Sequence, residues 1–199
     1  MSLLFDGFTG LYDSFMKLFG LDDCHVILKE IERRDCSVIH DVGGGTGTLA
    51  DLLVKSGKTV YLIDPSRAMT TAAGKRNSGI HIINSGYKRK LDVPMADVVV
   101  LKDAFHHIKE QEEVLRCCFD NLCEQGRIII QDFNPKSLSS KLLFMFERCC
   151  FERIYPMHPD KLKKLSENIG LNTEFFELNP RDYIYIGTKK HCEWHKGVS

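Results

Sequence analysis

The 199-residue sequence lacks an excess of charge of either sign, because 27 Lys and Arg residues balance 27 Asp and Glu residues. This balance gives no basis for attraction to an acidic membrane surface or to nucleic acid, and we expect no nucleic-acid partner. The sequence also lacks the run of about 18 to 20 apolar residues that spans a bilayer. Its first residues show no basic start followed by an apolar stretch, as a secretion signal would. We therefore expect a cytoplasmic protein.

The eight cysteines include no C-x-x-C pair, so a structural zinc site has little support. Without a secretion signal, disulfides are not expected, and the sequence favours buried free thiols. A thiol site for a soft metal or metalloid is a minor alternative. The segment 191–195 (His-Cys-Glu-Trp-His) has metal-binding side chains, but terminal segments are commonly poorly ordered. We expect no metal site and metal-independent chemistry.

Internal repeats and low-complexity segments are also absent, and the length suits one domain. We expect a helical cap over residues 1–35, a core over 36–190 and a tail over 191–199. Hydrophobic periodicity predicts helices over 8–19, 22–33, 46–56, 66–76, 108–125, 137–154 and 159–168. β-Branched and apolar runs predict strands over 37–42, 59–64, 80–83, 97–101, 127–131, 172–178 and 183–188.

The order of these elements indicates the fold class. Strands alternate with helices up to the last two strands, which no helix separates, so those two must form an antiparallel hairpin. Alternation of this kind is typical of a parallel sheet covered by helices on both faces. The sequence therefore predicts an α/β protein with a Rossmann-like, doubly wound, seven-stranded sheet that is parallel except for an antiparallel C-terminal strand.

A glycine-rich loop, Asp41-Val42-Gly43-Gly44-Gly45-Thr46-Gly47, follows the first predicted core strand and opens a helix. Glycines suit a tight turn against which a ligand lies, and ligands of open α/β sheets bind beyond the carboxyl ends of the strands. The run that starts at Gly45 also matches the dinucleotide pattern G-x-G-x-x-A. The loop alone therefore does not choose between cofactors.

Two carboxylates narrow this choice. Asp64 ends the second predicted strand, where it can accept hydrogen bonds from ribose hydroxyls of either cofactor. Asp41 stands before the first glycine, where a negative charge suits a cationic ligand and opposes the pyrophosphate of NAD. S-adenosylmethionine (SAM) carries an ammonium and a sulfonium, so Asp41 favours SAM.

Together these segments resemble the class I SAM-dependent methyltransferases. Asp41–Gly47 resembles the motif D/E-x-G-x-G-x-G, and Leu62-Ile63-Asp64-Pro65-Ser66 resembles the acidic second motif. Residues 97–108, which contain Lys102-Asp103-Ala104-Phe105-His106-His107, resemble the fourth-strand motif, and residues 126–132 resemble the fifth. The resemblance covers residues 36–190 and implies cofactor binding by Asp41, Gly43, Gly45, Gly47, Asp64, Pro65, Ser85, Lys102, Asp103 and Ala104.

Within this superfamily, the chain is most similar to the ubiquinone- and menaquinone-biosynthesis-like methyltransferases. The pair Tyr12-Asp13 and the approach to the sixth strand, residues 156–160, carry that similarity. The chain departs from the pattern after the third strand, where Asn84-Ser85 replace the usual acidic residue near the adenine. Ser85 or Asn84 would have to serve as the hydrogen-bonding group there.

The catalytic candidates are His106 and His107, because they follow the fourth strand on the ligand side and a neutral imidazole is available near pH 7. An alternative is that they cap the following helix or contact the cofactor through their backbone. His158 and Tyr12 are weaker candidates for contact with the methyl acceptor.

Residues 138–155, including Phe144, contain more apolar side chains than one packed helix face needs. The excess could be ordinary core, a lid over a hydrophobic acceptor, or a homodimer surface, in that order of preference. The sequence thus predicts methyl transfer from SAM to a small, hydrophobic or aromatic acceptor. A SAM-binding sensor or partner subunit without catalysis, and an NAD-dependent oxidoreductase, remain as alternatives.

Overall fold

A computed structural model of the chain describes residues 23–149 and 153–190. The strands within these ranges are β1 (Val38–Val42), β2 (Thr59–Ile63), β3 (His81–Ile83), β4 (Ala96–Lys102), β5 (Leu122–Phe133), β6 (Leu171–Glu177) and β7 (Asp182–Lys189). The helices are α3 (His25–Glu32), α4 (Thr48–Lys55), α5 (Arg67–Arg76), the 3₁₀-helix η1 (Phe105–His107), α6 (Gln111–Asn121), α7 (Leu138–Cys149) and α8 (Pro159–Ile169). No helix in these ranges is both long and apolar enough to span a membrane.

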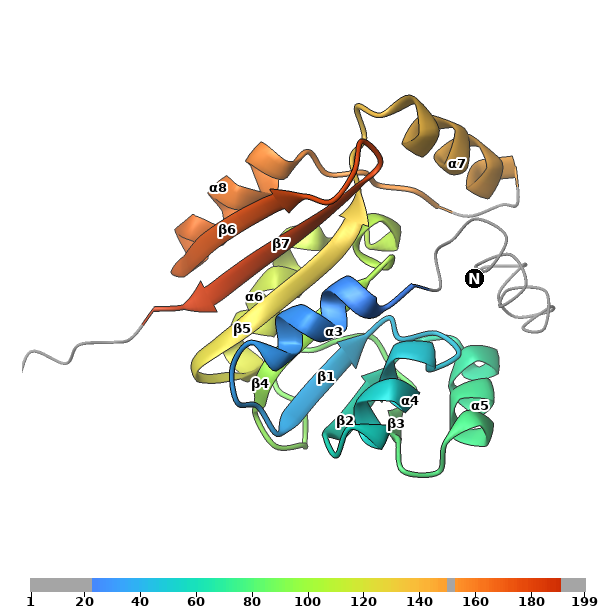
Figure 1. The fold of residues 1–199 in the computed structure, drawn as a ribbon, viewed down its shortest axis with the longest axis vertical. Coiled ribbons are helices and arrows are strands. Elements are labelled where there is room, and N and C mark those ends of the chain that lie inside the picture. Colours follow the sequence, from blue (N-terminus) through green and yellow to red (C-terminus); the bar gives the residue numbers. More distant parts are fainter. Residues whose placement is uncertain (1–22, 150–152, 191–199) are drawn as a thin grey trace, which may run out of the picture.

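The seven strands form one sheet in the order β3-β2-β1-β4-β5-β7-β6 (Figure 1). β1, β2, β3, β4 and β5 pair in parallel, whereas β7 runs antiparallel to both β5 and β6. This arrangement confirms the predicted Rossmann-like sheet with one reversed C-terminal strand. Because the chain crosses from β3 to β4 past β1, the sheet has a switch point between β1 and β4, where ligands bind in folds of this type.

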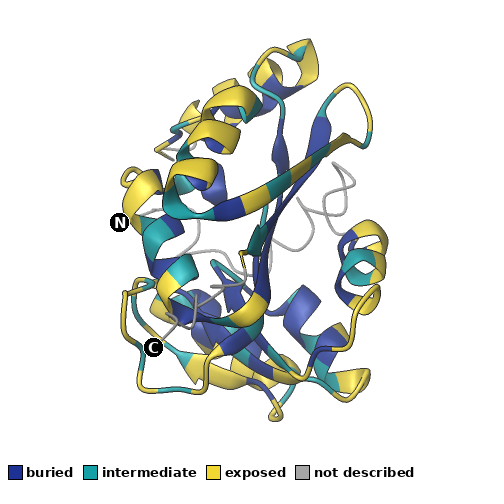
Figure 2. Cartoon of the chain, turned by 90° about the vertical axis from the view of Figure 1, so that its left-hand side faces the viewer, coloured by how far each residue is buried: buried dark blue, intermediate teal, exposed yellow. Residues whose placement is uncertain are grey.

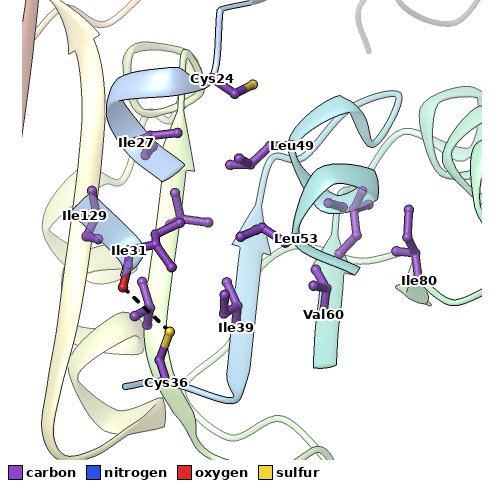
Figure 3. Close-up of a cluster of buried hydrophobic side chains, with 14 of the residues drawn as sticks. Cys24, Ile27, Ile31, Cys36, Ile39, Leu49, Leu53, Val60, Ile80 and Ile129 are labelled. Carbon is purple, nitrogen blue, oxygen red and sulfur yellow. Dashed lines mark hydrogen bonds between the residues drawn. The ribbon is translucent and has the colours of Figure 1, made fainter. Parts of the chain in front are cut away.

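Helices cover both faces of the sheet. Successive side chains of a strand point to opposite faces, so each strand contributes to the packing on both sides. In β4, Val98 and Val100 join a buried cluster beneath α3, α4 and α5, whereas Val99 and Leu101 join a cluster beneath α6 and α8. Figure 3 shows the first cluster, in which Leu53 of α4 lies above the strands. Buried residues concentrate in the strands and exposed ones on the outer sides of the helices (Figure 2). The strands therefore need to be apolar on both faces.

The cysteines of the described ranges are free thiols, and Cys24, Cys36, Cys117 and Cys118 are buried. The expectation of buried free thiols is thus confirmed for these four, whereas Cys149 is exposed. Burial, as the largest influence, raises the pKa of Cys24 to about 11, so this thiol stays protonated at neutral pH. Cys150 and Cys192 lie outside the described residues.

Two predicted helices had wrong boundaries. The helix predicted over 108–125 begins at Gln111 and ends at Asn121, since residues 105–107 form η1 and β5 already starts at Leu122. The helix predicted over 137–154 does not extend to residue 153, because residues 153–158 are not helical. There the backbone N–H of Tyr155 donates to the carbonyl of His106 over 2.6 Å, and Pro156 disfavours helical geometry at the residue before it. The helix predicted over 8–19 lies outside the described residues.

Candidate functional site

The glycine loop lies at the carboxyl end of β1 and has the backbone that its sequence predicts. Gly43, Gly45 and Gly47 have φ angles of 71°, 54° and 78°. Only glycine adopts such angles without steric cost, so the three glycines of the motif are the three that the turn requires. The turn ends at Gly47, from which α4 begins.

The loop also lies close to its neighbours. A Cβ atom added to Gly43 would lie 2.6 Å from the Cβ of Ala104, the residue that leads from β4 into η1. A Cβ added to Gly44 would lie 2.7 Å from Oδ2 of Asp41. Side chains are therefore excluded from the inner side of the loop, which leaves its backbone as the surface that a ligand can approach.

Asp64 follows β2 and holds the loop from the other side. Its Oδ2 accepts a hydrogen bond from the backbone N–H of Gly45 over 3.1 Å, and its Oδ1 accepts one from Ser66 over 2.8 Å. The Asn84 amide donates to the Asp64 carbonyl over 2.9 Å. The predicted second motif is thus brought beside the first, with Pro65 exposed between Asp64 and the N-cap of α5.

Asp41, at the end of β1, carries a carboxylate that the protein leaves partly unsatisfied. The residue is 1% exposed, and its Oδ2 atom has no hydrogen-bond partner. Burial, with a smaller contribution from the nearby Asp64, raises the pKa of Asp41 to about 7, although Lys102 opposes the shift. A buried carboxylate without a partner is costly, and a cationic ligand would relieve that cost. This oxygen fits the ammonium or sulfonium of SAM.

The raised pKa of Asp41 predicts that SAM affinity increases between pH 6 and 7.5. A cation binds the ionised carboxylate more tightly than the neutral acid, so affinity falls by up to about tenfold per pH unit below the pKa. The amino group of SAM stays mostly protonated over this range, since α-amino groups titrate near pH ~8. Calorimetric titration at constant ionic strength measures the slope, and Asp41→Asn should remove it. A flat profile for the unaltered protein would contradict this assignment.

The unliganded protein should show the opposite trend. Because folding raises the pKa of Asp41, its contribution to stability is complete below the ordinary pKa of an aspartate and is lost as the pH rises through about 7. Thermal unfolding without ligand should therefore occur at a lower temperature at pH 8 than at pH 6. Asp41→Asn should reduce this difference.

The residues after β4 form a second part of the same edge. Lys102 and Asp103, whose side chains are 9% and 8% exposed, form an ion pair of 2.5 Å. Asp103 has a φ of 52°, an angle that few residues other than glycine adopt, and its N–H donates to the carbonyl of Gln131. Strained backbone of this kind concentrates at functional sites. The turn directs the chain from β4 into η1, beside Gly43.

Within η1, His106 is held in a fixed orientation. Its Nδ1 lies 2.6 Å from Oδ1 of Asp132 on β5, and its backbone N–H donates to the other oxygen of that carboxylate over 2.9 Å. Burial alone would lower the pKa of His106, but Asp132 and Glu147 together raise it to about 10. His107 differs, because burial and the neighbouring His106 lower its pKa to about 3. The two predicted catalytic histidines thus have opposite protonation states at neutral pH.

Sequence reasoning missed Glu147 and the role of Asp132. The Nε2 atom of His106 lies 3.7 Å from Oε2 of Glu147 on α7, and both atoms are buried without a hydrogen-bond partner. Asp132 could have been found, because β4 and β5 are neighbours and Lys102 pairs with Gln131. The sequence gives no comparable indication for Glu147, because a charged residue in a helix is expected to face solvent.

The remaining residues that the sequence predicted to contact the cofactor or the acceptor have other roles or pack beside His106. His158 is the N-cap of α8, where its Nδ1 accepts from the N–H of Asp160 over 3.4 Å, so a structural role accounts for it. Phe144 is buried and its ring packs 5.5 Å from that of His106. The Ser85 hydroxyl donates to the Gly86 carbonyl, while Asn84 holds Asp64. Tyr12 lies outside the described residues.

The fold and this edge together define the class of protein. A Rossmann-like sheet with one reversed strand carries three glycines of positive φ, and beside them lie a buried acidic side chain without a full set of partners and a second carboxylate after β2. These are the features of a nucleoside-cofactor site that receives a cationic ligand.

Comparisons with known proteins identify the family. Residues 16–174 match the family model described as a methyltransferase domain. An uncharacterized methyltransferase from Bacillus cytotoxicus is 33% identical, over 94% of this chain and 97% of the relative. The chain therefore belongs to the class I SAM-dependent methyltransferases, and SAM is its methyl donor.

Solved structures show the same fold. A SAM-dependent methyltransferase from Thermotoga maritima, described as a possible histamine N-methyltransferase, has a TM-score of 0.75 at 16% identity, covering 96% of this chain and 100% of that one. Magnesium protoporphyrin IX methyltransferase from Synechocystis PCC 6803, solved with bound SAH, has a TM-score of 0.69 at 16% identity, covering 95% of this chain and 97% of that one. At such identities the likeness concerns the fold.

Proposed function

We propose that this enzyme transfers the methyl group of SAM to a small, hydrophobic or aromatic acceptor that binds beneath α7. SAM, when bound, supplies a methyl group on a positively charged sulfur. The residues that would hold it are Asp41, the three glycines and Asp64. The observation that carries the cofactor assignment is the buried, unpartnered Oδ2 of Asp41 beside that loop.

The hydrophobic character of the acceptor rests on α7. This helix begins shortly after β5, at the edge of the sheet where the cofactor residues lie, and Figure 1 shows β5 running toward it. Its inner residues Leu143 and Phe144 pack with Phe133 and Ile154. Its outer residues are apolar yet exposed: Leu138, Leu142, Met145 and Phe146 are 73%, 56%, 58% and 45% exposed. The helix therefore has more apolar surface than its packing uses.

A groove of about 440 Å³ runs along this helix, and its lining combines apolar and basic side chains. Phe144, Met145 and Pro156 supply the apolar part, whereas Lys141 and Arg148 supply positive charge. The combination suits an apolar molecule that carries an anionic oxygen, such as an aromatic carboxylate or a phenolate. Apolar pockets with a few polar groups are typical of small-molecule sites.

The test is transfer of labelled methyl groups from SAM to a panel of phenols, aromatic carboxylates and lipophilic amines. Met145→Asp should raise KM for an active acceptor at least tenfold, roughly 1.4 kcal/mol, and leave SAM affinity unchanged. Met95→Asp is the matched control, since Met95 is 51% exposed and lies away from the groove. Equal effects of the two substitutions would contradict binding beneath α7, and turnover with polar amines alone would contradict a hydrophobic acceptor.

The protonation states of the two histidines limit how an acceptor is activated. An imidazole acts as a general base only in its neutral form and does so best with a pKa near the working pH. His106 is held protonated by Asp132, and His107 is neutral but a weak base, with a pKa of about 3. The prediction of a catalytic base thus stays open for His107 and loses support for His106. The position of these two histidines beside Glu147 suggests a role other than that of a general base.

A further inference from the structure

His106, His107 and Glu147 form a group of side chains with the composition of a metal site. One possible ligand atom from each lies within 4.8 Å of the other two. Among the described residues this is the group of histidine, cysteine and acidic side chains that meets such a spacing. Two imidazoles and one carboxylate are a ligand set that zinc and other first-row transition ions accept in proteins.

The central pair of this group, His106 and Glu147, lies close together but forms no hydrogen bond. Nε2 of His106 and Oε2 of Glu147 are 3.7 Å apart, which is too long for a hydrogen bond, and neither atom has another partner. The His106 side chain is 2% exposed and that of Glu147 is 11% exposed, so both are largely buried. Two ligands of one tetrahedral zinc ion lie about 3.3 to 3.5 Å apart, close to the observed separation.

The surroundings of both histidines supply what metal ligands need. Nδ1 of His106 faces the Asp132 carboxylate at 2.6 Å and donates there, so a metal ion that displaces the proton of Nε2 would meet its lone pair on the side of Glu147. Nδ1 of His107 lies 3.4 Å from the carbonyl of Arg153. Carboxylates and carbonyls that accept from the far nitrogen orient metal-binding imidazoles and raise their basicity. The Phe133 and Phe144 rings pack against His106 at 5.2 and 5.5 Å, which limits access by water.

We propose that His106, His107 and Glu147 bind one divalent transition-metal ion, with Zn²⁺ as the probe. Asp132 is a positioning residue that orients His106. Closure around a tetrahedral ion requires the ligand atoms, which lie within 4.8 Å of one another, to approach to about 3.3 to 3.5 Å. This proposal differs from the sequence-based expectation of metal-independent chemistry, and the experiment below decides between the two.

Three protein ligands leave a position open, as in catalytic zinc sites. The groove along α7 shares Phe144 with the wall of this cluster. An anionic oxygen of the acceptor would fit the open position, where a metal lowers the pKa of a bound hydroxyl group and makes it a better nucleophile. This role of the ion rests on the proposed function, whereas the metal site itself does not.

The test measures metal binding directly, without SAM or acceptor. All proteins carry His191→Asn, Cys192→Ser and His195→Asn, because the tail has metal-binding side chains of its own. The metal-free parent is titrated with Zn²⁺ and, separately, with Co²⁺, whose visible spectrum reports ligand type and number. We expect one equivalent of Zn²⁺ and a cobalt spectrum of nitrogen and oxygen ligands without a thiolate band. Binding absent at micromolar Zn²⁺, or a thiolate band from Cys149, would overturn the proposal.

Single substitutions identify the ligands. Glu147→Gln and His107→Asn should each weaken Zn²⁺ binding at least tenfold, and Asp132→Asn should weaken it by about 10- to 100-fold. The matched controls His25→Asn and His81→Asn replace exposed histidines and should bind Zn²⁺ as the parent does. If the Asp132 variant does not fold, the two ligand variants still decide, because His107 is only partly buried. Equal Zn²⁺ affinity in the ligand variants and the control variants would overturn the metal site. Titration of the same proteins with SAM tests the proposed function separately, so failure of the metal site can be told from failure of the proposed function.

Discussion

Replacing Gly43 by alanine is expected to abolish SAM binding and to lower the thermal unfolding temperature by about 10 °C. The new Cβ would require a φ of 71° and would lie 2.6 Å from the Cβ of Ala104. The backbone angle costs about 1 to 2 kcal/mol, and relief of the contact must shift either the glycine loop or the turn before η1. A total of about 3 kcal/mol corresponds to roughly 6–12 °C for a protein of this size. Calorimetry with SAM and a thermal melt measure both effects.

Three further variants separate the causes. Gly57 has a φ of 85° but no atom within 4 Å of an added Cβ, so Gly57→Ala should show the cost of the angle alone and leave SAM affinity unchanged. Gly86→Ala, at an open position, should show neither effect. Adding Ala104→Gly to Gly43→Ala removes the atom that is contacted and should restore part of the stability. If Gly57→Ala destabilised the protein as much as Gly43→Ala, crowding against Ala104 would not be the cause.

The sequence was sufficient to predict the glycine loop because the requirements there are local. Positive φ angles at Gly43, Gly45 and Gly47 follow from the turn itself, and the turn follows from the end of β1. The sheet could be predicted for a similar reason: runs such as residues 98–101 are apolar at every position, as a strand covered on both faces must be. Such features depend on neighbours in the sequence.

The two parts that the sequence did not reveal depend on packing across the fold. Glu147 contacts His106 only because α7 lies over η1. Hydrophobic periodicity indicates which face of a helix is buried, but it does not indicate which other element packs against that face. The early end of the helix over 137–154 had a signal, since Pro156 follows Tyr155, but the apolar run outweighed it. Tyr155 instead donates to the carbonyl of His106, so the same segment that ends the helix also fixes the candidate metal site.

Asp41 and Asp64 have different roles although both are acidic residues at strand ends. Asp64 is satisfied by backbone N–H groups at both oxygens, so its charge supports the loop even without ligand. Asp41 has an oxygen without a partner and a raised pKa, so its ionised form lowers the stability of the empty protein, and a cationic ligand would offset that cost. A site organised in this way is less stable empty than occupied, and SAM should raise the unfolding temperature.

Asp64→Ala should weaken SAM binding by about 100-fold or more. Two hydrogen bonds from ribose hydroxyls to a carboxylate are worth about 1.5 to 3 kcal/mol each, and their loss leaves the hydroxyls unpaired. The substitution also removes the acceptors for the N–H groups of Gly45 and Ser66, so we expect a further loss of about 1 kcal/mol in the free energy of unfolding. Asp64→Asn keeps one acceptor oxygen and the shape of the side chain, and should weaken binding by about tenfold. Calorimetric titration with SAM and chemical denaturation measure these two quantities.

The matched control for this prediction is Asp51→Ala on α4. Asp51 also accepts two hydrogen bonds, from Lys55 and from Asn77 at 2.8 Å each, and its side chain is 13% exposed. It follows the loop by a few residues, but its side chain bonds Lys55 and Asn77 rather than the glycine loop, so its removal should cost stability without changing SAM affinity. If Asp51→Ala weakened SAM binding as much as Asp64→Ala, the effect would come from disturbing the loop rather than from lost contacts to the ribose. Unchanged affinity in Asp64→Ala would instead remove Asp64 from the cofactor site.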